Sequence, residues 1–138
     1  MMKNKTLWIG FVAVFVVFQL MGYVVHQVLL GDTYEAFAAV FRPQEEMFSA
    51  MWMMMLGQAA YLFVFCYIFT KGHEGKGITE GVRFGVLMGL FLSIPMAVDQ
   101  YVVFPISGNL ALAWFASSLA FLIVCGAVFA AIYKPDQP

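Results

Sequence analysis

The side chains best suited to chemistry lie inside long apolar stretches of the sequence. Asp99 follows Pro95 by four residues, and Gln100 comes directly after it. A carboxylate is costly within a lipid-facing helix, so such a residue is a candidate for binding a proton or a cation. Pro95 removes one helix hydrogen bond and frees a carbonyl oxygen one turn earlier. These residues predict a polar binding site near the end of a helix.

Further polar side chains lie in two other apolar stretches. Gln19, His26 and Gln27 fall on roughly one face of a helix over 6–30, and Gln58 lies in the next stretch. Polar groups inside membrane helices usually face the bundle or a water-filled space. We therefore add these four residues to Asp99 and Gln100 as candidate binding residues.

The depths of two of these residues suggest a pair. At about 1.5 Å per residue, His26 lies about 30 Å from Thr6, and Asp99 lies about 25 Å from Val82 along its helix. We expect the two side chains to meet near the outer interface, directly or through one water. The alternative is that both simply reach the outer headgroups or cap helix ends.

Three methionines share one face of the second apolar stretch, at positions Met47, Met51 and Met55. Thioethers are soft ligands that suit Cu(I). The chain resembles copper-import proteins in pairing a Met-xxx-Met helix with a Gly-xxx-Gly helix, but it lacks their methionine-rich external tail. Because methionine is also an adaptable packing residue, core packing is the favoured interpretation and a copper site the alternative.

No catalytic set or cofactor motif is recognisable. The sequence has neither a His-Glu-x-x-His zinc motif nor a Gly-x-Ser-x-Gly elbow. Gly75-Lys76 is followed by glycine, so 71–80 fits a flexible solvated turn with an exposed His73 better than a phosphate loop. Cys66 and Cys125 are expected to be small buried hydrophobes. We predict no enzyme, and a net charge of −1 argues against nucleic acid.

Small residues recur every four positions along the third apolar stretch. Such a ridge lets helix backbones approach closely in lipid. It could pack within one chain or between two chains. The ridge consists of Gly77, Gly81, Gly85, Gly89, Ser93 and Ala97.

The elements that must position these residues are four apolar stretches, at 6–30, 47–69, 82–103 and 110–133. The chain of 138 residues is 63% hydrophobic and 11% charged, whereas soluble proteins are about 25% charged. Each stretch has the roughly 20 residues that a helix needs to cross hydrocarbon. We predict an all-α polytopic membrane protein, with one transmembrane domain over 1–138 that forms an antiparallel four-helix bundle.

Basic residues indicate the orientation of this bundle. Six of the seven Lys and Arg residues fall on the side of the two termini and the middle loop, and only Arg42 falls on the other. The positive-inside rule places both termini in the cytoplasm of a bacterial cell, with the bundle in the inner membrane. Lys3 and Lys5 precede a run too long for a signal-peptide core, so we expect a retained first helix.

The first external loop, 31–46, shows helical features. Asp32 and Glu35 fit a capping box. Aromatic residues then recur at helical spacing, at Tyr34, Phe37 and Phe41. We expect a short helix in the membrane interface with its aromatic face toward lipid. The alternative is a loop whose aromatic side chains pack on the bundle.

Several short segments make the chain similar to small four-span bacterial membrane proteins of unknown function. The similarity implies an inner-membrane four-helix protein and transfers no activity or catalytic residue. Its segments are His26 to Leu30, Arg42-Pro43 with Glu46-Met47, Glu74-Gly75-Lys76, and Glu80-Gly81 with Arg83 to Gly85.

Two functional hypotheses follow. The favoured one is a non-enzymatic membrane protein that acts by helix association, as a homo-oligomer or as an accessory subunit of a larger membrane complex. The alternative is a small transporter or ion pathway with Asp99 as its protonatable or cation-binding group. His26, Gln27, Gln100 and Met51 would line that pathway. The sequence indicates no substrate, and a metal cation such as copper is the weaker version of the alternative.

Overall fold

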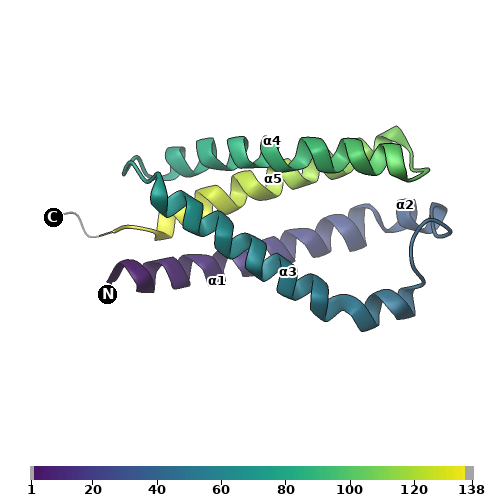
Figure 1. Cartoon of the computed structure of the whole chain (residues 1–138), viewed down its shortest axis with the longest axis horizontal. Coiled ribbons are helices and arrows are strands. Elements are labelled where there is room, and N and C mark those ends of the chain that lie inside the picture. The colour runs from purple at the N-terminus through teal and green to yellow at the C-terminus, as the bar shows by residue number, and fades with distance from the viewer. Residues whose placement is uncertain (1, 136–138) are drawn as a thin grey trace.

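The computed structural model describes residues 2–135, which form helices and no strand (Figure 1). Four helices are long and apolar enough to cross a membrane, as predicted. The first span, Asn4–Leu29, combines α1 with a π-helical end, η1. A short helix, α2, follows it. The bounds are α1 Met2–Tyr23, η1 Val24–Leu29, α2 Gly31–Ala36, α3 Gln44–Lys71, α4 Ile78–Val103 and α5 Gly108–Ile132.

Helices α4 and α5 form a tightly packed antiparallel hairpin. A Cβ atom at Gly85 would overlap the backbone of Leu122, and one at Gly81 would overlap the backbone of Gly126. The small side chains therefore let the two backbones touch. Gly81, Gly85 and Gly89 of the ridge pack against α5 of the same chain.

Gly77 is not part of this ridge. It precedes the first turn of α4 with a φ of 69°, and a Cβ atom there would meet nothing within 4 Å. A positive φ favours glycine because it lacks a Cβ atom. Its four-residue spacing from Gly81 reflects a turn rather than a helix contact.

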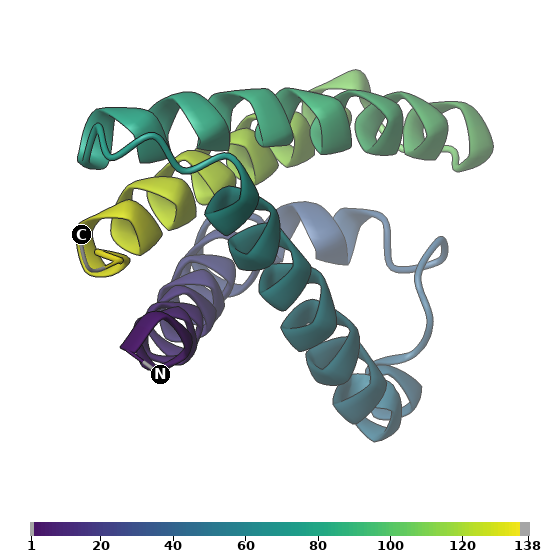
Figure 2. The ribbon, with the colours of Figure 1, turned by 60° about the vertical axis from the view of Figure 1, so that its left-hand side comes forward.

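Helix α3 packs on the bundle through its second half only. Its buried residues are Leu62, Phe65, Cys66 and Phe69. Its first half diverges from α4 and α5, and Phe48 and Trp52 are exposed there (Figure 2). The bundle is consequently closed at one end and open at the other.

Both ends of the described chain lie at the closed end of the bundle. The start of α1, the end of α5 and the connection from α3 to α4 share that end (Figure 1). Phe69, Phe129 and Tyr133 pack together there. Cys66 and Cys125 are free and fully buried in the same core, which confirms their predicted packing role.

The connection from α3 to α4 is organised around Glu80, contrary to the predicted flexible turn. The Glu80 carboxylate is buried and accepts hydrogen bonds from the backbone N–H groups of Glu74 at 2.6 Å and Lys76 at 2.8 Å. His73, predicted to be exposed, packs against Phe69 and Tyr133, with Nδ1 3.3 Å from Glu80 Oε1. A buried carboxylate needs such donors, and here they come from the loop itself.

The first loop contains a helix, but two predictions about it were wrong. Asp32 lies inside α2, and Leu30 occupies the position before its first turn, so no capping box forms. The aromatic side chains of Tyr34 and Phe37 pack against Ile106 and Leu110 of the bundle rather than facing lipid. These bulky rings bury more apolar surface against the bundle than they would at the membrane interface, which favours packing on the bundle.

Candidate functional site

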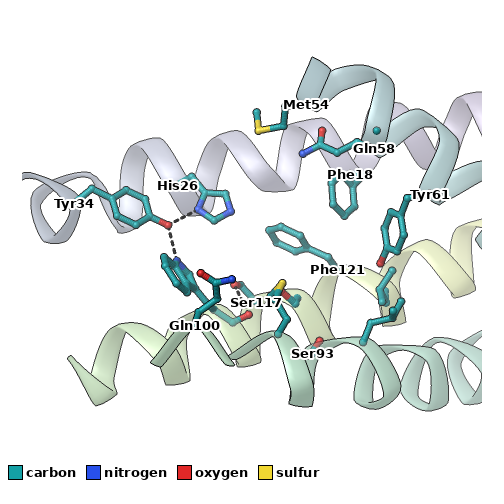
Figure 3. A pocket seen from close by; sticks show the side chains of 16 residues that line it. Phe18, His26, Tyr34, Met54, Gln58, Tyr61, Ser93, Gln100, Ser117 and Phe121 are labelled. Carbon is teal, nitrogen blue, oxygen red and sulfur yellow. Dashed lines mark hydrogen bonds between the residues drawn. The ribbon is translucent and has the colours of Figure 1, made fainter. Parts of the chain in front are cut away.

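A cavity lies between the diverging part of α3 and the other helices. Its volume is about 750 Å³, and it is partly open. Side chains from every helix line it (Figure 3). This size lies within the range of pockets that hold small organic ligands, about 300–1,000 Å³.

Local sequence explains why a cavity forms at this depth. Gly57 of α3 lines the cavity and has no side chain to fill it. Ser93 of α4 and Ser117 and Ser118 of α5 also line it, and their small side chains leave space. The π-helical turns of η1 contain His26, and the N–H of Leu30 reaches back to the carbonyl of Val25 at 2.8 Å. Such widened turns re-aim side chains and are frequent at functional sites.

A hydrogen-bonded triad lies at the end of the cavity nearest α2. Tyr34 Oη lies 2.6 Å from His26 Nδ1, and Trp114 Nε1–H donates to the same oxygen at 2.7 Å. Figure 3 shows both bonds meeting at the Tyr34 hydroxyl. The triad joins η1, α2 and α5, so it fixes the short helix on the bundle.

The proton positions in this triad follow from its donors and acceptors. Trp114 can only donate, so the Tyr34 oxygen accepts from it. We assign the Tyr34 hydroxyl proton to a bond with His26 Nδ1, because the opposite arrangement leaves that proton without an acceptor among residues 2–135. His26 is then neutral and carries its own proton on Nε2.

A second polar contact lies deeper in the bundle. Gln19 Nε2 donates to Gln58 Oε1 at 2.7 Å and so links α1 to α3. Gln58 lines the cavity, whereas Gln19 lies behind it. The bond uses the oxygen of Gln58 and leaves its NH₂ group free to donate.

Two other polar side chains line the cavity without hydrogen-bond partners among the described residues. Ser93 is 1% exposed, and its hydroxyl is unpaired. Gln100 is half-buried, and none of its side-chain atoms is hydrogen-bonded within 2–135. Buried polar groups usually have partners, and both side chains are free to bond to water or to a ligand in the cavity.

The structure brings together some of the predicted site residues and separates others. His26, Gln58 and Gln100 line the cavity, as does Ser93 from the ridge. Asp99 is exposed and has neither a hydrogen bond nor an ion pair within the described part of the chain. The direct His26–Asp99 contact that we expected is absent, because α4 is rotated so that Ser93 and Gln100 line the cavity and Asp99 is exposed.

The remaining candidates also lie outside the cavity lining. Gln27 and Met47 are exposed, and Met51 and Met55 are half-buried. Of the described residues, no group of three or more His, Cys, Asp and Glu side chains could hold a metal ion. Whether Met47, Met51 and Met55 bind copper remains a prediction.

Tyr34 and Trp114 were missed as site residues. Tyr34 lies just outside the first predicted span, and its spacing with Phe37 and Phe41 predicts a lipid-facing surface. Trp114 offered the clearer signal, because a tryptophan inside an apolar helix needs an acceptor for its indole N–H. No sequence pattern identified that acceptor.

The chain matches no protein-family model, no curated protein and no solved structure.

Proposed function

We propose that this multi-pass membrane protein binds a small lipid-soluble molecule in the cavity between α3 and the other helices. One observation carries the proposal: a partly open cavity of about 750 Å³ holds the unpaired, buried Ser93 hydroxyl among side chains that are mostly aromatic and apolar. Apolar walls with a few placed polar groups are typical of ligand sites. The diverging half of α3 offers a route from the lipid.

The charge distribution supports an orientation for this binding protein. The start of α1, the end of α3, the connection to α4 and the end of α5 lie together at the closed end of the bundle (Figure 1). These segments contain Lys5, Lys71, Lys76 and Lys134. We infer that this end faces the cytoplasm of a bacterial inner membrane and that the cavity opens toward the outer leaflet. A ligand would therefore enter from the outer half of the bilayer.

Filling the cavity tests the proposal. A Cβ atom at Gly57 would meet nothing within 4 Å, so Gly57→Phe can place a ring in the cavity without a backbone clash. The protein is purified from its own membrane, and its co-purifying small molecules are measured by mass spectrometry. We expect roughly tenfold less of one molecule in Gly57→Phe, because overpacking a filled site costs about 1–3 kcal/mol.

Gly22→Phe provides the matched control. Gly22 also has nothing within 4 Å of a built Cβ atom, and it does not line the cavity. The control should retain the wild-type level of the bound molecule. Equal small-molecule content in wild type, Gly57→Phe and Gly22→Phe would contradict the proposal.

Association with another chain is a second candidate, with one observation in its favour. The ridge of α4 no longer supports it, because that ridge packs on α5. The first half of α3 exposes Phe48, Trp52 and Leu56, and this face could pack against a second copy or a larger membrane complex. Crosslinking through a cysteine at Phe48 in native membranes would show that partner, and a monomer alone would exclude it.

A further inference from the structure

Three polar side chains of the cavity present free hydrogen-bond donors. In the assigned triad, His26 presents Nε2–H, and it has no partner for it among residues 2–135. Gln58 offers its NH₂ group because its oxygen accepts from Gln19. Ser93 offers an unpaired hydroxyl. A ligand that satisfies these three donors must bring acceptor atoms such as carbonyl oxygens.

The cavity lining carries no permanent charge. It contains no Asp, Glu, Lys or Arg side chain. A phosphate or carboxylate head would lack the cation that usually pairs with it, and an ammonium head would lack an anion. The ligand head that fits is therefore neutral.

Aromatic rings form the walls between these donors. Phe18 and Phe121 meet edge to face with ring centroids 5.5 Å apart. The ring centroid of Tyr61 lies 6.4 Å from that of Phe18. Figure 3 shows these rings beside the open space that His26, Gln58 and Gln100 border. Flat rings pack well against such walls. The head of the ligand is thus expected to be a ring.

We propose that the cavity binds a quinone: a neutral ring with carbonyl oxygens on opposite edges and an apolar tail. One carbonyl accepts from His26 at the outer end, and the other accepts from Gln58 and Ser93 deeper in the bundle. The tail leaves beside the diverging half of α3 into lipid. This inference rests on the proposed binding function and names its ligand class.

Fluorescence of Trp114 can report binding directly. Trp8 and Trp52 are 55% and 65% exposed, so replacing both with Phe leaves Trp114 as the single tryptophan at low structural cost. The full chain is placed in nanodiscs of phosphatidylcholine and titrated with decylubiquinone, because quinones quench tryptophan. We expect saturable quenching. Decylbenzene, which shares the tail but has no carbonyl oxygen, should not compete.

Two variants test the donors. The double variant Gln58→Leu with Ser93→Ala removes two donors and replaces them with apolar side chains of similar size. It should weaken decylubiquinone binding about tenfold. Gly57→Phe should abolish saturation, and Gly22→Phe should not change it. Circular dichroism and gel filtration of each variant establish that the bundle is intact.

The outcomes separate the two proposals. Quenching that never saturates, while Gly57→Phe still loses a co-purified molecule, would overturn the quinone assignment and leave the binding function standing. Displacement of decylubiquinone by decylbenzene would also overturn it, because recognition would then rest on the tail. Non-saturable quenching together with unchanged co-purified molecules in Gly57→Phe would overturn both proposals.

Discussion

At the residue scale, one hydroxyl group connects three parts of the structure. Tyr34 accepts from Trp114 and contacts His26, and these bonds hold α2 over the cavity. Burial raises the pKa of Tyr34 above its ordinary value of 10.0. The phenol therefore stays neutral at neutral pH. The stability that the neutral hydroxyl contributes to the folded state is fully present below pH 10 and is lost as pH rises through the raised pKa.

Tyr34 should consequently titrate above pH 10. The measurement is the tyrosinate absorbance of the wild type minus that of Tyr34→Phe, which isolates one of the six tyrosines. We also expect Tyr34→Phe to lower the unfolding free energy by about 1–3 kcal/mol, because it leaves the Trp114 N–H without an acceptor. A difference titration centred at or below pH 10 would contradict the burial of this hydroxyl.

At the element scale, the α4–α5 hairpin depends on the absence of side chains at its contact. Gly85→Leu should destabilise the fold by about 1–3 kcal/mol or more, because its Cβ atom would enter the backbone of α5. Thermal unfolding in detergent, followed by circular dichroism, measures the loss. Gly22→Leu serves as the control, since its position is open.

The same pair of variants distinguishes packing inside the chain from packing between chains. If Gly85→Leu kept the wild-type unfolding temperature and only converted an oligomer to a monomer, the ridge would act between subunits. We expect the reverse result. The carbonyl oxygens that Gly81 and Gly85 approach belong to Gly126 and Leu122 of the same chain.

At the scale of the whole molecule, the shared position of the two chain ends can be tested in cells. Cys66 and Cys125 are buried, so both can be replaced with alanine to give a background without reactive thiols. Cysteines placed at Asn4 and Lys134 should react with a membrane-impermeant maleimide only after the membrane is permeabilised. A cysteine at the exposed Glu45 should react in intact cells. Labelling of Asn4 from outside would reverse the proposed orientation.

The sequence by itself determined the four spans and their alternating direction. Their physical cause is local: each run is long and apolar enough to cross lipid, and a backbone in lipid must satisfy its own hydrogen bonds within a helix. The polar residues His26, Gln58 and Gln100 were also identifiable as candidates, because polar groups are costly in such runs. None of these inferences needed to know which helix touches which.

Only the tertiary structure decided how these residues combine. The rotation of α4 turned Ser93 inward and left Asp99 exposed, although both lie on the same helix. The fold also brought Tyr34 from a loop to His26 and to Trp114, which lies 80 positions further along the chain. Helix rotation and long-range packing depend on how all the surfaces fit together, and no spacing within one segment encodes that fit.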